Sequence, residues 1–271
     1  MPRTWLITGT SRGFGRAWAE AALERGDRVV GTARDTRTND DLVATYPETF
    51  RVLALDVTDR AAAFDAVKQA HDHFGELDIV VNNAGYGHFG AIEELSEAEV
   101  RDQIETNLFG ALWVTQAALP YLRERGAGHI LQVSSIGGVS AFPTIGAYHA
   151  SKWGLEGFSQ ALAQEVAGFG ISVTLIEPGG FATDWAGDSA RRSKPIAAYG
   201  PAREAVAQAQ AGRPAGDPVA SAQALLRVID ADEPPLRCFF GVAPINVIEA
   251  DYAARLQTWR AWQPTAELAQ G

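Results

Sequence analysis

A tyrosine and a lysine four positions apart, Tyr148 and Lys152, are the residues of this chain best suited by type and spacing to acid–base chemistry. On a helix both side chains point along one face. A tyrosine with an unperturbed pKa of about 10 is a poor base at neutral pH, but a nearby ammonium favours the phenolate and lowers that pKa. The pair could therefore exchange a proton with an oxygen atom of a substrate.

Ser135 lies upstream of this pair and could donate a hydrogen bond to the same substrate oxygen as charge develops on it. It belongs to a segment, 126–150, that contains no Asp, Glu, Lys or Arg. The glycines and serines of this segment, together with Pro143, argue against a membrane span. We therefore expect a buried strand followed by an active-site loop.

A glycine-rich turn, TGTSRGFG, comes directly after the first apolar run and contains Gly9, Gly13 and Gly15. Glycine permits a positive φ and lets the backbone approach a pyrophosphate. A helix that begins here, with the helical pattern Arg16–Arg25, would present free N–H groups and a partial positive charge. The turn is a candidate anion cradle, but such a turn can also be purely structural, so its assignment depends on motifs elsewhere.

The spacing of these glycines resembles the T-G-x-x-x-G-x-G fingerprint of the classical short-chain dehydrogenases/reductases. The other motifs of that family follow in order: Asp56-Val57, Asn82-Asn83-Ala84-Gly85, Asn107, Ser135 ahead of Tyr148-x-x-x-Lys152, and Pro178-Gly179. The match covers about the first 185 residues, and the set is far more specific than any one motif. The chain is identified as a member of this family on that resemblance.

The resemblance implies an oxidoreductase that interconverts a ketone or aldehyde and an alcohol, with hydride transfer to or from a nicotinamide cofactor. In the family the tyrosine is the general acid/base, and the lysine also hydrogen-bonds the nicotinamide ribose. By the same resemblance Asn107 holds a water that links Lys152 to solvent, and Asp56 accepts from the adenine amino group. The catalytic group so implied is Asn107, Ser135, Tyr148 and Lys152.

The end of the second expected strand bears on the choice between NAD and NADP, because an acidic side chain there accepts from the ribose 2′-OH and repels a 2′-phosphate. Ala33 takes the position where NAD-preferring relatives carry Asp, and Arg34 follows it. Arg34 and Arg12 could pair with the phosphate, although each alone could equally be a solvated arginine, and Asp35 would weaken the site if it turned inward. We expect NADP(H), bound by Gly9, Ser11, Arg12, Gly13, Phe14, Gly15, Arg34, Asp56, Val57, Asn83, Ala84, Gly85, Tyr148, Lys152, Pro178, Gly179, Phe181 and Thr183.

The substrate pocket is expected to be apolar and partly aromatic. Its expected residues are Tyr86, His88, Phe89, Ser135, Val139, Phe142, Tyr148, Gly180 and Trp185. None is a cation, which favours a hydrophobic carbonyl over a substrate with a free carboxylate or phosphate. Several of the aromatic residues could instead pack the core. The segment 181–217 has weak periodicity and is expected to carry one or two short helices and to act as a lid. Arg191, Arg192 and Lys194 are interpreted as a solvated cluster.

The elements that must position these residues follow from the apolar pattern. Short apolar runs, typical of buried parallel strands, alternate with amphipathic helical patterns. The runs are Trp5–Thr8, Arg28–Ala33, Phe50–Leu55, Ile79–Val81, His129–Val133, Ser172–Ile176 and Arg237–Phe240. Ser96 with Glu99, and Asp217 with Pro218, mark two helix starts. We expect the α/β class, with a Rossmann-type doubly wound parallel β-sheet of about seven strands flanked by helices on both faces.

The composition fits one large globular domain. The chain has 271 residues, of which 46% are apolar and 21% charged. We expect a single domain over 1–271 with a C-terminal helical tail at 245–271, helical over Val247–Trp262. A net charge of −10 argues against a nucleic-acid partner. One cysteine, Cys238, and a first strand that starts by Trp5 predict a cytoplasmic protein without a signal peptide or membrane span.

Other kinds of site have little support. His71 and His73 lie in an amphipathic helical pattern without carboxylates or cysteines arranged around them, so no metal is expected. Ser134 and Ser135 lack the G-x-S-x-G turn of a hydrolase nucleophile.

Some alternatives remain open from the sequence. The chain could be a non-catalytic NADP-binding regulatory or sensor protein, although its tyrosine and lysine are intact. An epimerase or dehydratase of the extended relatives is disfavoured by the glycine spacing and by the lack of a large C-terminal domain. The family acts on steroids, sugars, acyl thioesters, polyketides and simple ketones, so the resemblance does not identify the substrate. Relatives often form dimers or tetramers through the long helices around Asn107 and after Lys152, and we expect a homodimer or homotetramer.

Overall fold

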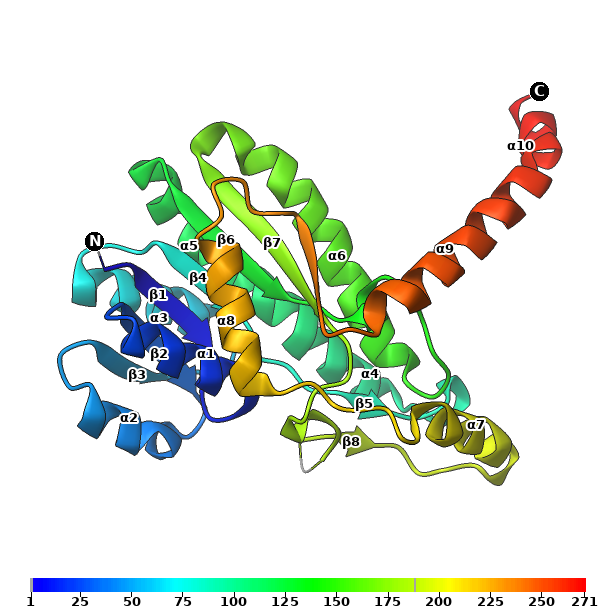
Figure 1. The fold of residues 1–271 in the computed structure, drawn as a ribbon, viewed down its shortest axis with the longest axis horizontal. Coiled ribbons are helices and arrows are strands. Elements are labelled where there is room, and N and C mark those ends of the chain that lie inside the picture. The colour runs from blue at the N-terminus through cyan, green and yellow to red at the C-terminus, as the bar shows by residue number, and fades with distance from the viewer. Residues whose placement is uncertain (1, 188) are drawn as a thin grey trace.

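The chain folds around a seven-stranded parallel sheet, seen in a computed structural model that describes residues 2–187 and 189–271 (Figure 1). The strands of this sheet are β1 (Thr4–Thr8), β2 (Arg28–Ala33), β3 (Phe50–Ala54), β4 (Ile79–Asn82), β6 (Gly128–Val133), β7 (Ile171–Pro178) and β9 (Arg237–Phe240). Their order is β3-β2-β1-β4-β6-β7-β9, and each pairing is parallel. The strand order therefore reverses between β1 and β4, the point where doubly wound folds bind ligands. The predicted fold class is confirmed, and each predicted strand lies within two residues of its expected ends.

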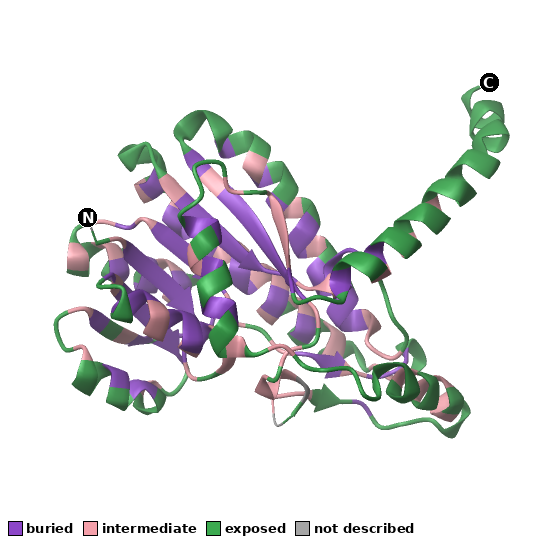
Figure 2. Ribbon diagram, viewed as in Figure 1, coloured by how far each residue is buried: buried purple, intermediate pink, exposed green. Residues whose placement is uncertain are grey.

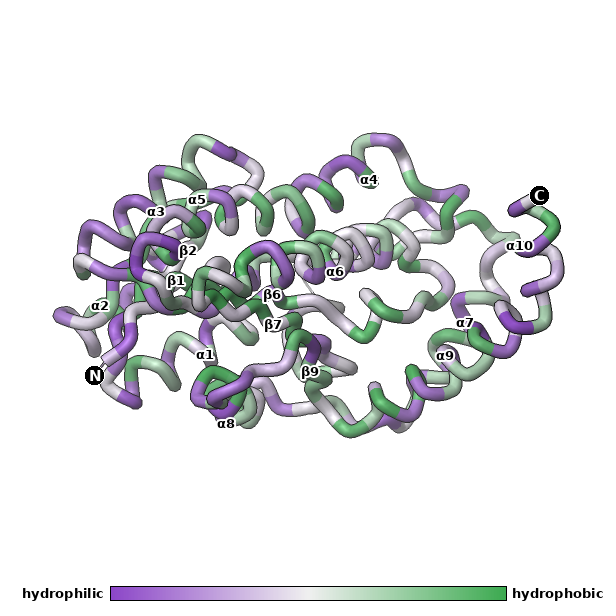
Figure 3. Tube along the Cα trace, turned by 90° about the horizontal axis from the view of Figure 1, so that it is seen from above, coloured by the Kyte–Doolittle hydropathy of each residue, from purple (hydrophilic) through white to green (hydrophobic). Residues whose placement is uncertain are grey.

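Helices cover both faces of the sheet. The described α-helices are α1 (Gly13–Glu24), α2 (Asp40–Thr45), α3 (Arg60–Phe74), α4 (Glu97–Ile104), α5 (Gly110–Arg125), α6 (Gly146–Val166), α7 (Gly200–Gln210), α8 (Pro218–Ile229), α9 (Pro244–Ala261) and α10 (Gln263–Gln270). Trp5 and Ile7 of β1 join the core under α1 and α8, and Leu6 joins the core under α3, α5 and α6. Because successive strand residues point to opposite faces, both faces are apolar, which explains the nearly continuous apolar runs. The buried strands lie between partly exposed helices (Figure 2), and hydrophobic residues concentrate along β6 and β7 (Figure 3).

Local signals place two helix starts as expected. The Ser96 hydroxyl accepts from the backbone N–H of Glu99, whose carboxylate accepts from the Ser96 N–H, and α4 follows. Asp217 caps α8 in front of Pro218. One feature differs from the expectation of a regular helix at Asn107: a π-helical turn, Glu105–Phe109, joins α4 to α5. Such turns widen a helix locally and are frequent at functional sites.

The segment 181–217 leaves the sheet and returns to it. It contains 3-10 turns at Asp184–Ala186 and Ala197–Tyr199, the short strand β8 (Arg191–Arg192) and α7. The prediction of one or two short helices is confirmed for its described part. The pairing of β8 with β5 (His88–Phe89) was not predicted, because strands of two residues leave no pattern in the sequence.

The C-terminal helices α9 and α10 extend away from the sheet (Figure 1) and are mostly exposed (Figure 2). Only Pro244 and Ile248, near the start of α9, are buried. The helix begins three residues before the predicted Val247 and a second helix continues it to Gln270. Within the described residues, no helix combines the length and the apolar character that crossing a membrane requires.

Candidate active site

The glycine-rich turn after β1 is a tight backbone bend at the start of α1. Gly9 and Gly13 have φ of 74° and 60°, in the left-handed region that favours glycine. A Cβ on Gly15 would lie 2.3 Å from the carbonyl oxygen of Gly9, so a side chain there cannot be accommodated without moving the backbone. The Asn83 amide donates to the carbonyls of Thr8 (2.8 Å) and Gly9 (3.0 Å) and holds the bend. The N-terminus of α1 is thus exposed to an anion that approaches the glycines.

The two arginines expected near a 2′-phosphate have different surroundings. Arg34 is exposed at the end of β2 and forms no ion pair with any residue the structure describes, whereas Arg12 pairs with Asp184 at 2.7 Å. The Asp35 carboxylate accepts from the Arg37 guanidinium at 2.9 and 2.7 Å, and this interaction lowers the pKa of Asp35. Asp35 and Arg37 therefore neutralise each other beside Arg34.

The predicted acid–base group comes together at the carboxyl end of the sheet. Tyr148 and Lys152 lie on α6, each only 6% exposed, and the Lys152 ammonium is 5.8 Å from the centre of the Tyr148 ring. Lys152 Nζ donates to the carbonyl oxygen of Val133, the last residue of β6, at 2.6 Å. Ser135 follows β6, accepts from the Gly137 N–H at 3.0 Å, and hydrogen-bonds the Tyr148 side chain.

Burial controls the protonation of this pair. Loss of water raises the pKa of Tyr148 to about 12, opposed by the hydrogen bond with Ser135. Burial lowers the pKa of Lys152 to about 8, opposed by the negative charge of Glu156. The phenol therefore keeps its proton at neutral pH and can act as an acid. The pKa of the lysine lies only about one unit above neutral pH.

Asn107 is 2% exposed and connects three parts of the site. Its amide donates to the Tyr86 carbonyl (3.0 Å) and the Ser151 hydroxyl (3.2 Å), and its oxygen accepts from the Tyr86 N–H (3.1 Å). A Cβ on Gly85 would lie 3.0 Å from the Asn107 oxygen. Asn107 thus fixes the loop after β4 against α6.

His149 is a residue that sequence reasoning missed. Its Nδ1 lies 2.8 Å from the Gly137 carbonyl oxygen, and its Nε2 accepts from the Phe142 N–H at 2.9 Å, so the Nδ1–H tautomer fits both contacts. Burial lowers its pKa and keeps it neutral. The ring ties the loop that follows Ser135 to α6. A histidine beside Tyr148 in a segment without charged residues was the only sequence signal.

One of the predicted substrate residues, Trp185, contacts Tyr148 directly. The Trp185 ring stands edge-on to the Tyr148 ring at 5.0 Å and lies 5.3 Å from Phe89. Phe142 is 37% exposed and contacts His149, whereas Val139 is buried at 6% exposure.

The other predicted substrate residues contact strand β8. His88 is 1% exposed and its Nε2 lies 2.9 Å from the Ser193 hydroxyl, so it holds β5 to β8. The guanidinium of Arg191 lies 4.6 Å from the centre of the Tyr86 ring, and that of Arg192 lies 5.2 Å from the Phe89 ring. Arg191, Arg192 and Lys194 are exposed, as the sequence predicted for a solvated cluster. In addition, the two arginines contact two of the predicted pocket aromatics.

The segment after β7 folds over the glycine-rich turn. Gly179 donates to the Phe240 carbonyl at 3.0 Å, Phe181 packs against Phe14 at 4.9 Å, and Thr183 lies beside Gly13. Asp56 is exposed at the end of β3, where its carboxylate accepts from the N–H and hydroxyl of Thr58. Pro178 and Val57 are buried beneath this edge. The predicted cofactor residues thus lie at the carboxyl ends of the strands, in the loops that follow them, in the first turn of α1, or, for Tyr148 and Lys152, on α6.

Comparison with known proteins gives consistent matches. Residues 3–194 match the family model for short chain dehydrogenase. Oxidoreductase BOA17 of Botryotinia fuckeliana is 44% identical over 245 residues, covering 89% of each chain. The crystal structure of a short-chain dehydrogenase from Streptomyces avermitilis superposes with a TM-score of 0.93 at 39% identity, covering 98% of both chains. An alcohol dehydrogenase from Thermococcus sibiricus, complexed with 5-hydroxy-NADP, gives a TM-score of 0.73 at 26% identity, covering 89% of this chain and 96% of that one.

The family assignment therefore rests on three separate observations. These are the reversal of strand order between β1 and β4, the buried Tyr148 and Lys152 with Ser135 beside a glycine cradle, and similarity along most of the chain. The chain belongs to the short-chain dehydrogenase family of oxidoreductases.

Proposed function

We propose that this protein is an NADP(H)-dependent carbonyl reductase or alcohol dehydrogenase that uses Tyr148 as its general acid/base. The observation that carries the proposal is the buried contact of Tyr148 with both Ser135 and the Lys152 ammonium, at the edge of the sheet that also holds the glycine cradle. A phenol, a hydroxyl donor and an ammonium in one site match the needs of a carbonyl oxygen that gains negative charge and then a proton.

The residues present fit a dinucleotide. Side chains on Gly9 and Gly15 would crowd neighbouring atoms, Gly13 has a positive φ that favours glycine, and α1 begins at this bend, where a pyrophosphate would approach. When bound, the nicotinamide supplies or accepts the hydride. Tyr148 Oη then gives its proton to the substrate oxygen, and Ser135 donates a hydrogen bond to the same atom. Lys152 stabilises the phenolate that remains.

The preference for NADP(H) follows from charge at the end of β2. Ala33 places no carboxylate there, Arg34 is exposed without an ion-pair partner in the described chain, and Asp35 is neutralised by Arg37. A guanidinium in this place matches a 2′-phosphate. The Thermococcus sibiricus alcohol dehydrogenase, whose structure this chain resembles, is complexed with an NADP derivative, which supports this assignment.

The substrate we infer is a hydrophobic ketone or aldehyde. Trp185 contacts Tyr148, Phe89 contacts Trp185, and the partly exposed Phe142 contacts the neighbouring His149. Segment 181–217 supplies Trp185 and serves as the lid. Arg191 lies behind Tyr86 and already pairs with Asp102 at 2.8 Å, so it is not an open partner for an anionic substrate.

The assembly and location are proposals of the same kind. Helices α5 and α6 form the self-association surface of a homodimer or homotetramer. A groove on the surface between them supports this, lined by Leu112, Thr115, Gln116, Leu119, Phe158, Ala161, Leu162 and Glu165. The net charge of −10 is in keeping with a cytoplasmic location without a nucleic-acid partner.

A panel of carbonyls tests this function. Aromatic and long-chain ketones, small charged keto acids and matching alcohols are assayed with NADPH or NADP⁺ and with NADH or NAD⁺, by absorbance of the reduced nicotinamide. We expect turnover of hydrophobic ketones with NADPH. NADPH binding without turnover of any carbonyl would favour a sensor, and a preference for charged keto acids would contradict the apolar pocket.

A further inference from the structure

A second group of buried charges lies one helical turn from Lys152 and plays no part in the chemistry above. Glu156 of α6 and Glu177 of β7 have side chains that are 7% and 0% exposed. The Arg237 Nε of β9 lies 2.8 Å from Glu156 Oε2 and 3.4 Å from Glu177 Oε1. The same guanidinium donates to Gln160 at 2.9 Å. One cation thus serves two buried carboxyl groups.

Three of the four carboxyl oxygens of this pair lack a hydrogen-bond donor within the described residues. Within the described part of the chain, neither oxygen of Glu177 nor the Oε1 of Glu156 has a hydrogen-bond partner. Two adjacent carboxylates that accept but do not donate are costly to bury, and a proton held between them supplies the missing donor. Burial and the charge of Glu156 raise the pKa of Glu177 to about 8, and Arg237 opposes the rise.

The pair lies against the catalytic group on two sides. Lys152 and Glu156 are four residues apart on α6, both are buried, and the charge of Glu156 raises the pKa of Lys152. A Cβ on Gly138 would lie 2.5 Å from the Ser134 hydroxyl and 3.0 Å from Glu156 Cγ, so Glu156 packs under the turn that carries Ser135.

Besides Glu177 of β7, the charged and titratable groups of this cluster come from two elements. α6 contributes Lys152 and Glu156. β9 contributes Arg237 and Cys238, whose thiol pKa is raised by burial and by Glu177. The nearby end of β6 contributes Val133 and no titratable side chain. Lys152 is therefore the active-site cation whose pKa depends on whether the glutamate pair is protonated.

We propose that Glu156 and Glu177 share a single proton and, held by Arg237, form a positioning pair that keeps the Lys152 ammonium charged beneath Tyr148. The pair touches neither substrate nor cofactor and acts through Lys152. The inference of a shared proton depends on the burial and geometry of the two glutamates and not on the proposed function. The consequence for turnover rests on the proposed reductase function.

The shared proton is tested without turnover. Protein labelled with carbon-13 at the glutamate carboxyls is titrated by NMR without cofactor or substrate. One carboxyl is expected to titrate near pH 8. That signal disappears in Glu177→Gln and moves to lower pH in Glu156→Gln, because the neighbouring charge is gone. Exposed Glu124→Gln, on α5, is the control and leaves it unchanged. Titration of every glutamate below about pH 6 overturns the shared proton.

Stability against pH gives a second reading. Because the pKa of Glu177 is raised on folding, its contribution is fully present below an unfolded pKa of about 4.3. It then shrinks about tenfold in the unfolding equilibrium constant per pH unit, and it is gone above the folded value of about 8. Glu177→Gln should lack this decline. An identical pH dependence in the wild type and Glu177→Gln contradicts the proposal.

The effect on Lys152 is read from the pH profile of ketone reduction. Removing the anion in Glu156→Gln lowers the pKa of Lys152, so the alkaline limb of kcat should move down by about one pH unit. In Glu156→Asp, which keeps a carboxylate, the alkaline limb should stay close to its wild-type position. In Glu124→Gln it should not move. An unmoved limb in Glu156→Gln removes the positioning role. Absence of turnover in the wild type contradicts the reductase function instead and leaves the NMR result to decide on the shared proton.

Discussion

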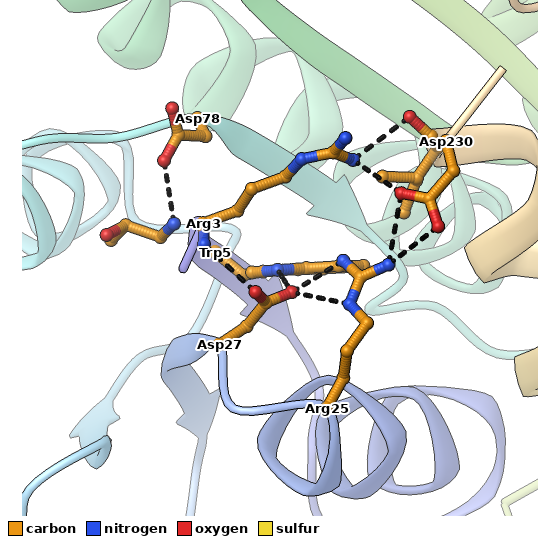
Figure 4. Close-up of polar contacts among 8 residues, drawn as sticks. Arg3, Trp5, Arg25, Asp27, Asp78 and Asp230 are labelled. Carbon is orange, nitrogen blue, oxygen red and sulfur yellow. Dashed lines mark hydrogen bonds and ion pairs between the residues drawn. The ribbon is translucent and has the colours of Figure 1, made fainter. Parts of the chain in front are cut away.

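Buried carboxylates lie at both ends of the central sheet, but they are compensated in different ways. At the amino end, Asp27 is surrounded by donors (Figure 4): the Arg3 N–H and the Trp5 indole at 2.9 Å, and the Arg25 guanidinium at 2.5 Å. Towards the carboxyl end, Glu177 accepts no hydrogen bond from the described residues, and its one cation, Arg237, lies 3.4 Å away and is shared with Glu156. The first arrangement keeps a full negative charge, whereas the second requires a proton.

The difference reflects what each end does. Around Asp27, Arg25 and Arg3 also pair with Asp230 at 3.0 and 2.9 Å, which ties α1 and β1 to the end of α8. Charged groups with all their partners in place hold elements together and have no hydrogen-bonding atoms left for a ligand. At the carboxyl ends of the strands, polar groups must stay available for ligands and protons. Substitutions at the amino end should therefore change stability, and those at the carboxyl end should change chemistry.

The largest expected effect is on turnover. Tyr148→Phe removes the proton donor and should lower kcat about 10²–10⁴-fold. It removes one hydrogen bond, with Ser135, so the free energy of unfolding should fall by only about 1 kcal/mol. Steady-state kinetics and urea denaturation measure the two quantities, with Tyr46→Phe as the control. Near-normal turnover in Tyr148→Phe would remove this tyrosine from the mechanism.

The opposite pattern is expected at the amino end. Asp27→Ala leaves the Trp5 indole and part of the Arg25 guanidinium without their acceptor. The free energy of unfolding should fall by about 3–5 kcal/mol, as for other broken buried ion pairs, while kcat per folded molecule is kept. Exposed Asp232→Ala is the matched control. A loss of turnover without a loss of stability would break the contrast between the two ends.

Arg34, which has no ion-pair partner among the described residues, should affect cofactor choice. Arg34→Asp replaces a phosphate partner by a carboxylate that repels the phosphate and accepts from a ribose 2′-OH. The ratio of kcat/KM for NADPH to that for NADH should fall at least about tenfold, or about 1.4 kcal/mol, with no change in stability. Arg123→Asp, on the exposed side of α5, controls for net charge. A constant ratio would show that Arg34 points to solvent.

The smallest effect is expected at the Arg12–Asp184 ion pair. If Arg12 must leave Asp184 to reach a 2′-phosphate, Asp184→Asn should tighten NADPH binding by up to about fivefold, the range of an exposed ion pair. Titration of NADPH fluorescence measures the dissociation constant. The gain should vanish in Arg12→Ala/Asp184→Asn. Unchanged affinity in Asp184→Asn would mean that Arg12 does not contact the phosphate.

The fold and the catalytic group could be predicted because their signals are local. Each strand is a continuous apolar run, and Tyr148 and Lys152 lie four residues apart on one helix. The glycine bend is recognisable since its residues are consecutive and their backbone geometry admits little else. Helix ends such as Ser96 and Asp217 carry their own capping side chains.

The remaining features depend on distant residues. Glu156, Glu177 and Arg237 lie on three elements, and nothing in the spacing of their sequence positions indicates that they meet. The contact of Trp185 with Tyr148 depends on how a long excursion folds back. A charged residue in an apolar run, such as Glu177, was the one available sign of a buried group that needs a proton.

Transfer of a labelled hydride tests the central claim most directly. The protein is incubated with a hydrophobic ketone and NADPH deuterated at the nicotinamide C4, and the alcohol is analysed by mass spectrometry and NMR. The account predicts one deuterium on the carbinol carbon of the alcohol. Tyr148→Phe should form far less of this deuterated alcohol, and the matched control Tyr46→Phe should form as much as the wild type. An alcohol without deuterium, or no alcohol from any ketone that binds, would contradict it.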